Sequence, residues 1–183
     1  HHELGAAGYV HVGMDHFALP EDPLVQAQRD GSLQRNFQGY STQGGSDLLG
    51  FGASAISQVG DVYAQNATAI ADWEACVREG RSPVAKGYVR NADDRLRGDI
   101  IQSLMCHGRV DIAAIERRHG IDFADYFADL QPTLANMAND GLLQAGRRVL
   151  RLTERGHFLM RSVAVLFDAH RGHESAARFS RAI

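Results

Sequence analysis

The chain has 183 residues, 44% of them hydrophobic and 22% charged, so it is long enough to bury a core and is not a disordered segment. Its uninterrupted apolar runs are only a few residues long, which excludes a helix that spans a bilayer. No basic stretch followed by an apolar one opens the chain, so we expect a cytoplasmic protein without a secretory signal. His1 and His2 fit native sequence and a tag remnant equally well.

The formal net charge of −3 is unevenly distributed along the chain. Residues 1–140 carry 11 basic and 19 acidic side chains, whereas residues 141–183 carry eight arginines and three acids. A basic C-terminal end is compatible with nucleic-acid binding. A solvated arginine face explains the same charges, and this is the interpretation that we favour.

The first half of the chain shows a strand, a helix and a long polar loop. Apolar residues alternate over residues 10–14, which predicts a strand with one buried face. Pro23 suits the first turn of a helix over residues 24–29. Residues 36–52 are rich in Gly, Ser, Thr, Gln and Asn, and we expect them to form a loop.

A second helix and a linker complete this half. Asn66 is a good N-cap residue, so we expect a helix to follow it and to end at Gly80. Residues 80–87 contain Gly, Ser and Pro, a composition typical of a linker. We therefore place a boundary near residue 88, between a first unit over 1–88 and a second over 89–183.

The second half is mainly helical. Three successive helices are predicted from cap residues at Asn91, Asp111 and Asp122, and Pro132 should break or kink the third. A hairpin centred on residues 145–146 follows, and a closing helix should cover residues 154–170. This order of elements resembles a winged helix-turn-helix.

The segment Gly50-Phe51-Gly52-Ala53-Ser54-Ala55 fits the loose dinucleotide-binding pattern G-x-G-x-x-G/A. That motif must open a helix, and Gly60 interrupts the segment that follows, so a Rossmann site has little support. We infer only that the backbone near Gly50 and Gly52 is closely approached by another group, which a tight turn would also explain.

Metal and hydrolase sites have no support in the sequence. The two cysteines, Cys76 and Cys106, are too few to hold a cluster, and we expect both thiols to pack as small apolar groups. No two of the nine histidines have the helical i, i+4 spacing of a zinc site, and no G-x-S-x-G motif occurs. Asp15 and His16 follow a strand end, where barrel enzymes place active-site residues, although an ion-paired turn is the alternative.

Arginines gather around the predicted hairpin at positions 147, 148, 151 and 155, where a DNA-binding wing contacts phosphates. The helix that would read bases instead carries Asp122, Asp125 and Asp129 and no basic residue. Its charge would repel a duplex, so we interpret the unit as a packing module that binds no nucleic acid.

Three uncommon strings occur in order: Gly-Met-Asp-His-Phe-Ala at 13–18, Asn-Phe-Gln-Gly-Tyr at 36–40, and Asp-Leu-Leu-Gly-Phe-Gly-Ala-Ser-Ala-Ile-Ser at 47–57. Together they resemble the oxygen-independent coproporphyrinogen III oxidases, radical S-adenosylmethionine (SAM) enzymes of haem synthesis. Segments 60–66, 123–127 and 179–183 also resemble this family. The three cysteines of the family, spaced C-x-x-x-C-x-x-C, are absent, so we expect a C-terminal fragment that is inactive alone.

The resemblance implies an α+β fold. Residues 1–88 would be the C-terminal portion of an incomplete (β/α) radical SAM barrel with its linker, and residues 89–183 a helical, winged-helix-like domain. The full-length enzyme would use SAM and a [4Fe–4S] cluster to convert two propionates of coproporphyrinogen III to vinyl groups, giving protoporphyrinogen IX. The cofactors would supply that chemistry and the protein would position them.

The resemblance also implies site residues. Ile56 would contact the cluster-bound SAM, and Gln38 would lie near a second SAM. Further candidates for the carboxylates or pyrrole nitrogens of the substrate are Arg35, Asp15, His16 and Tyr40. No residue of this chain is expected to bind metal, and exposed barrel edges make self-association of the fragment plausible.

Two alternatives stay open. A haem-chaperone-like branch of the same superfamily has a similar Leu-Leu-Gly-Phe-Gly string, although the strings at 13–18 and 35–40 favour the oxidase. A winged-helix nucleic-acid-binding module would require residues 1–88 to be accessory, which their density of motifs argues against.

Overall fold

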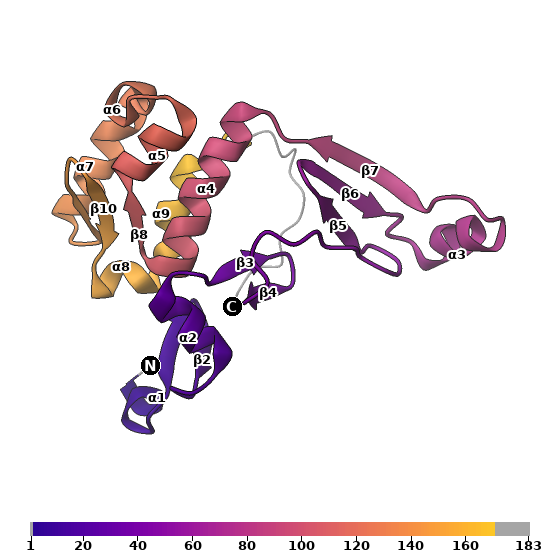
Figure 1. The fold of residues 1–183 in the computed structure, drawn as a ribbon, viewed down its shortest axis with the longest axis horizontal. Helices are drawn as coiled ribbons and strands as arrows, with labels where there is room; N and C mark the ends of the chain where they lie inside the picture. The colour runs from indigo at the N-terminus through magenta and orange to yellow at the C-terminus, as the bar shows by residue number, and fades with distance from the viewer. Residues whose placement is uncertain (1, 171–183) are drawn as a thin grey trace.

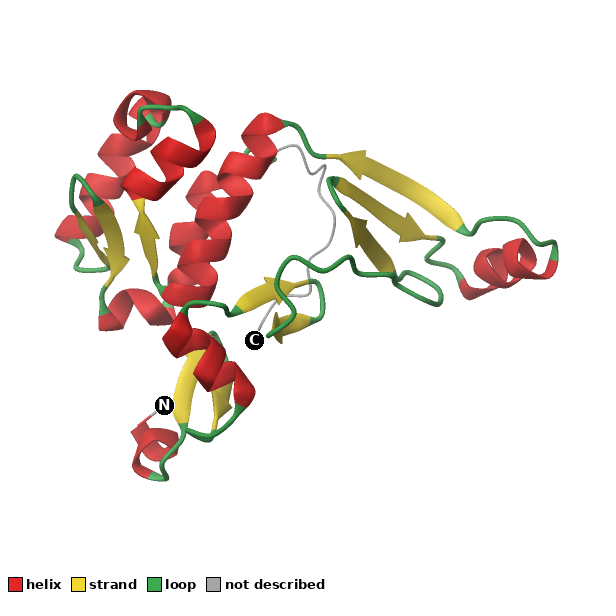
Figure 2. Cartoon of the chain, in the orientation of Figure 1, coloured by secondary structure: helices red, strands yellow, loops and turns green. Residues whose placement is uncertain are grey.

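A computed structural model describes residues 2–170 of the chain, and the string at 179–183 lies outside these residues. The described part is a mixed α+β structure with small sheets in which neighbouring strands are antiparallel. Helix α4 (Ala92–His107) lies between a helical group and two further groups of elements (Figures 1 and 2). No helix within residues 2–170 is long and apolar enough to cross a membrane.

The N-terminal group contains two hairpins and two helices beneath α4 (Figure 1). Asp22 caps the predicted helix, Pro23 occupies its first turn, and Gly31 ends it in the left-handed conformation. The strand and helix predicted here are confirmed, while part of the expected loop forms a hairpin. The elements are α1 (His2–Ala6), β1 (Val10–Gly13), β2 (His16–Ala18), α2 (Pro23–Asp30), β3 (Gln34–Asn36) and β4 (Gly39–Ser41).

The second group is a three-stranded sheet that extends away from α4 and carries one helix at its far end (Figure 1). Its elements are β5 (Ile56–Val59), β6 (Val62–Asn66), α3 (Ile70–Arg78) and β7 (Val84–Val89). The prediction that Asn66 caps a helix is wrong: it ends β6, where its buried side-chain amide donates to the Gly52 carbonyl at 2.9 Å. The segment expected to be a linker instead enters β7, which pairs with β6.

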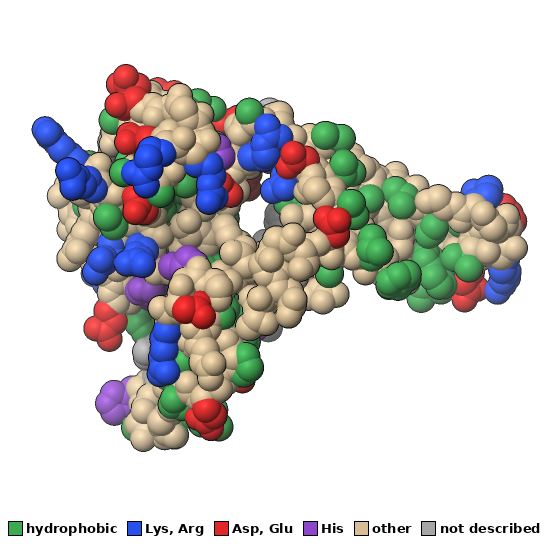
Figure 3. All heavy atoms as spheres, viewed as in Figure 1, with side chains coloured by type: hydrophobic (Ala, Val, Ile, Leu, Met, Phe, Trp, Pro, Cys, Tyr) green, Lys and Arg blue, Asp and Glu red, His purple; other side chains and the backbone are tan. Residues whose placement is uncertain are grey.

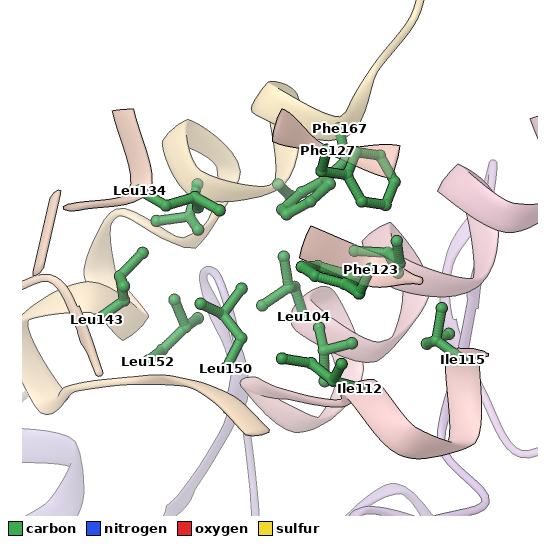
Figure 4. Packing of buried hydrophobic residues seen from close by; sticks show 14 of the residues in the cluster. Leu104, Ile112, Ile115, Phe123, Phe127, Leu134, Leu143, Leu150, Leu152 and Phe167 are labelled. Carbon is green, nitrogen blue, oxygen red and sulfur yellow. The ribbon is translucent and has the colours of Figure 1, made fainter. Parts of the chain in front are cut away.

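The helical group packs around one buried stripe of α4. Asn91 caps α4, as predicted, in a reciprocal capping box with Asp94, and Gly108 ends the helix in the left-handed conformation. Leu96, Ile100 and Leu104 repeat every four residues and are almost fully buried. Figure 4 shows Leu104 with Leu143, Leu150 and Leu152 on one side and Phe123 on the other.

The remaining elements confirm the predicted order but not every length. Asp111 and Asp122 cap α5 and α6, yet α6 ends at Tyr126 and a new helix begins at Gln131, with Pro132 in its first turn. The predicted hairpin is confirmed and gains a third strand, which the sequence did not predict. The elements are β8 (Arg109–Asp111), α5 (Ile112–His119), α6 (Phe123–Tyr126), η1 (Ala128–Leu130), α7 (Gln131–Asn139), β9 (Leu143–Ala145) and β10 (Val149–Leu152).

The prediction of a single closing helix over residues 154–170 is wrong. The chain instead forms α8 (Glu154–Phe158), α9 (Met160–Ala164) and a 3₁₀ turn, η2 (Val165–Phe167). The helix is interrupted at Leu159, whose backbone leaves the helical region. This change of direction lets α9 and η2 bury Met160, Val163 and Phe167 against α4 and the aromatic part of the core.

Tyr40 joins the N-terminal group to the end of α4. Its hydroxyl donates to the Met105 carbonyl at 2.9 Å, and a Cβ added at Gly13 would collide with that hydroxyl. Cys106 packs in the same region with Val12 and Leu33. Burial raises the pKa of Tyr40 to about 12, so the phenol keeps its proton and its hydrogen bond across the ordinary pH range.

Replacement of this hydroxyl tests the junction. We expect Tyr40→Phe to lower the free energy of unfolding by about 1–2 kcal/mol, because the Met105 carbonyl loses its buried donor. Since the folded pKa of Tyr40 lies above its unfolded value, the wild type should lose stability as pH rises from about 10 to about 12. Urea unfolding at pH 8 and pH 11 would reveal this loss, and Tyr40→Phe should show less of it. Equal stability of both proteins at both pH values would contradict the assignment.

Gly98 provides a second test, because it lies in the interior of α4 and a Cβ there would meet nothing within 4 Å. We therefore expect Gly98→Ala to raise the free energy of unfolding by about 0.5–1 kcal/mol, the usual helix-propensity difference. Gly156→Ala is the matched control: its Cβ would collide with the Leu142 carbonyl, and the variant should be destabilised. The melting temperatures of both variants measure these changes in stability. A lower melting temperature for Gly98→Ala than for wild type would contradict the prediction that a Cβ fits at this position.

Candidate functional site

Five of the six site residues predicted from the sequence lie on the two hairpins of the N-terminal group. His16 Nδ1 lies 2.9 Å from Asp15 Oδ1, and the His16 ring meets the Tyr40 ring edge-on at 5.2 Å. Arg35 also lies against Tyr40, with its guanidinium carbon 5.8 Å from the centre of the Tyr40 ring. The structure thus brings together the residues assigned to the substrate.

These residues differ in what they are free to do. The Asp15–His16 pair is exposed, so the interaction contributes little to stability. The Tyr40 hydroxyl already donates its hydrogen bond to the Met105 carbonyl. Arg35 is half-buried, and its Nε is buried without a hydrogen-bond partner. Arg35 is therefore the member of the group whose guanidinium has no acceptor in the described part of the chain.

Gln38 lies exposed in the turn between β3 and β4. Its backbone amide donates to Asn36 Oδ1 at 2.8 Å, which holds the turn in shape. The neighbouring Phe37 is 54% exposed and meets the Tyr63 ring edge-on at 5.3 Å, linking the hairpin to β6. The turn therefore presents an amide and an aromatic ring side by side.

Ile56 begins β5 on the other sheet and is half-buried. A Cβ at Gly50 would lie 2.6 Å from the Ile56 carbonyl oxygen, so the group that closely approaches Gly50 is the backbone of Ile56 itself. The Rossmann interpretation is wrong, because the segment leads into a strand and not a helix. Ile56 remains a branched apolar side chain on an edge strand, a type that packs against a flat ring.

Two cavities open beside these residues. One, of about 350 Å³, has Phe37, Tyr63 and Tyr88 in its lining. The other, of about 200 Å³, is lined by Arg35, Arg90 and mostly uncharged polar residues. Sequence reasoning did not single out Tyr63, Tyr88, Arg90 or Gly98, because only long-range contacts place them here. The one local signal was Gly98, a glycine inside a well-capped helix.

The described part of the chain does not offer the ligands of an iron–sulfur cluster. Within residues 2–170 there is no group of three or more His, Cys, Asp or Glu side chains that could hold a metal ion. Burial raises the pKa of the Cys106 thiol to about 12, so it is not available as a thiolate. Cys76 lies on α3 with its sulfur 3.5 Å from an Arg81 nitrogen.

The arginines of the β9–β10 hairpin are exposed at positions 147, 148 and 151, as is Arg155. Asp122 and Asp125 cap and open the short helix α6, with Asp129 exposed just beyond it. The element that would have to enter a DNA groove is thus four residues long and acidic. Figure 3 shows basic and acidic side chains interspersed over this part of the surface.

Comparison with known proteins gives one consistent result. Residues 91–159 match the family model described as the HemN C-terminal domain. The oxygen-independent coproporphyrinogen III oxidase of Pseudomonas aeruginosa is 48% identical over 99% of this chain, and that of Escherichia coli is 44% identical over 98%. The chain covers 39% and 40% of these relatives, so it spans about two fifths of their length.

A solved structure agrees with the sequence relatives. It is titled as coproporphyrinogen III oxidase (HemN) from Escherichia coli, a radical SAM enzyme, and is 44% identical to this chain. The TM-score is 0.89, over 92% of this chain and 39% of that chain. The resemblance predicted from the sequence is confirmed: over nearly its whole length this chain is similar to oxygen-independent coproporphyrinogen III oxidases, and residues 91–159 match the HemN C-terminal domain.

Proposed function

We propose that this chain is the C-terminal part of an oxygen-independent coproporphyrinogen III oxidase and acts together with a preceding region of the kind its relatives carry. The observation that carries the proposal is 48% identity over 181 residues with the Pseudomonas aeruginosa oxidase. The relatives reported above are named as oxidases, which favours this activity over that of a haem-chaperone-like enzyme. The reaction would convert two propionates of coproporphyrinogen III to vinyl groups.

In this proposal, the chain contributes binding groups and the preceding region supplies the cluster ligands. Reductive cleavage of SAM would provide the radical that removes hydrogen from a propionate. Ile56 would pack against SAM through its half-buried apolar side chain, and Gln38 would reach a second SAM from the exposed turn. Arg35 would bind a carboxylate of the substrate.

The proposal also gives an occupant for an exposed apolar face. Val59 and Val62 pair across β5 and β6, Val62 pairs with Val89 of β7, and all three are more than 40% exposed. Figure 3 shows hydrophobic side chains gathered over this sheet. Residues 1–88 would be the end of an incomplete barrel that the preceding region covers, and residues 89–183 a winged-helix-like domain packed beside it. Without that cover, we expect the chain to self-associate through this face.

A chimera tests the proposed function. The preceding region of the Pseudomonas aeruginosa relative is joined to this chain in place of its own C-terminal part. We expect the chimera, but not this chain alone, to bind iron and to convert coproporphyrinogen III to protoporphyrinogen IX under anaerobic conditions. The readouts are iron content and product fluorescence after oxidation. A folded, iron-loaded chimera that forms no product would contradict the proposal.

The assignment of Ile56 is tested in the same chimera. We expect Ile56→Asp to keep its iron and its melting temperature but to lose SAM affinity more than tenfold, because a carboxylate there would be desolvated without a partner. Ile56→Ala should weaken SAM binding less than Ile56→Asp does. Val77 lies on α3 with 49% of its surface exposed, and Val77→Asp should leave SAM affinity unchanged. Calorimetric titration with SAM measures the difference. SAM affinity within about threefold of wild type, below roughly 0.7 kcal/mol, would remove Ile56 from the cofactor site.

A further inference from the structure

The two cavities beside α4 meet. We call the larger one, with Phe37, Tyr63 and Tyr88 in its lining, the aromatic cavity, and the smaller one, with Arg35 and Arg90, the arginine cavity. Tyr63, Arg90 and Gly98 line both of them. An apolar compartment therefore opens directly into a cationic one, at the face of α4 opposite the buried leucines.

Arg90 pairs with Asp61 at 3.0 Å, but the charge of Arg35 in the arginine cavity is not balanced within the described part of the chain. Within residues 2–170, the side chain of Arg35 makes no hydrogen bond or ion pair, and its guanidinium is stacked on the Tyr40 ring. The carboxylate that lines the same cavity, Asp99, is already paired with Arg118 at 3.0 Å and His119 at 2.9 Å. A half-buried guanidinium without an acceptor is unfavourable, so this arrangement is suited to an incoming anion.

Arg90 adds a second guanidinium with an unpartnered nitrogen. One terminal nitrogen of Arg90 donates to Asp61 and to the Gly60 carbonyl, each at 3.0 Å, which fixes the guanidinium 5.3 Å above the Tyr63 ring. Its Nε is buried and has no acceptor. The two buried side-chain polar atoms without a hydrogen-bond partner in the described part of the chain are thus Arg35 Nε and Arg90 Nε, and both residues line the arginine cavity.

Gly98 keeps the junction open. Glycine inside a helix is unfavourable compared with alanine, and at this position no neighbouring atom would be crowded by a side chain. Packing within the chain therefore gives no reason for a glycine here. Its absent side chain leaves the passage between the two cavities free.

We propose that the two cavities form one binding site for a ligand that combines an apolar ring with a carboxylate. The carboxylate accepts from Arg35 and Arg90 in the arginine cavity, and the ring lies in the aromatic cavity against Phe37 and Tyr63. A volume of about 350 Å³ for the aromatic cavity is within the range of small-ligand sites. This inference rests on the proposed function, and it assigns to the site one pyrrole of coproporphyrinogen III with its propionate.

The experiment titrates the full 183-residue chain with coproporphyrin III, the stable oxidised form of the substrate, and follows porphyrin fluorescence. We expect saturable binding that Arg35→Gln and Arg90→Gln each weaken about tenfold or more. Gly98→Leu should abolish binding without lowering the melting temperature, because its side chain enters the passage and not the core. Arg78→Gln, which removes an exposed arginine of α3, is the matched control and should bind as wild type.

A second readout separates ligand contact from a structural role. In ¹⁵N-labelled protein, the Nε–H resonances of Arg35 and Arg90 should shift on addition of coproporphyrin III, while that of Arg78 should not. Absence of binding, or wild-type affinity in all three variants, would overturn the site even if the chimera described above is active. An inactive chimera together with arginine-dependent binding would sink the proposed function and leave the carboxylate site standing.

Discussion

Helix α4 must be buried along one stripe and open along another, and the rest of the described structure depends on this constraint. Leu96, Ile100 and Leu104 enter the core of the helical group, and full burial of such side chains is worth about 1.5–3 kcal/mol each. The capping box at Asn91 and the left-handed Gly108 fix where the helix starts and stops. The position of both ends then determines where the neighbouring groups attach.

The other faces of α4 set the geometry of the site. Its C-terminal end receives Tyr40 and Cys106 packs under β1, which holds the β3–β4 hairpin and Arg35 in place. Its N-terminal end follows β7 closely, so Arg90, in the short connection between them, lines the same cavity as Gly98. Arg35 and Arg90 are 55 positions apart in sequence, yet both line one cavity beside α4. The same element thus stabilises the core and assembles the candidate site.

Local chemistry explains what the sequence predicted correctly. The helices with a capping side chain and a terminal glycine, such as α2 and α4, carry their boundaries within a few residues of sequence. Asn66 has the same local chemistry but pairs within a sheet, because its amide satisfies the Gly52 carbonyl. Strand β7 was missed since all its residues are exposed and no alternating pattern marks a buried face. The division near residue 88 stays a prediction.

The candidate site was predictable only in part. Ile56, Gln38 and Arg35 lie in strings that resemble a known family, so the sequence alone pointed to them. Tyr63 lies in the segment 60–66 that also resembles the family, but its place in the cavity was not predicted, and Arg90 carries no such signal. The position of both residues comes from pairing between β6 and β7 and from the position of α4. The i, i+4 spacing of Asp93 and Arg97 on a predicted helix indicates an ion pair for Arg97, whereas no local pattern shows that Arg35 lacks a partner.

Amide hydrogen exchange of this chain, with and without coproporphyrin III, tests most directly whether α4 has these two functions. The structure predicts that the amides of residues 100–106 exchange among the slowest, together with those of β10 and α9, and more slowly than those of β5–β7. Porphyrin should add protection at β3, β6 and residues near Gly98. The account would be contradicted if α4 exchanged as fast as β5–β7, or if the added protection fell on the β9–β10 hairpin instead.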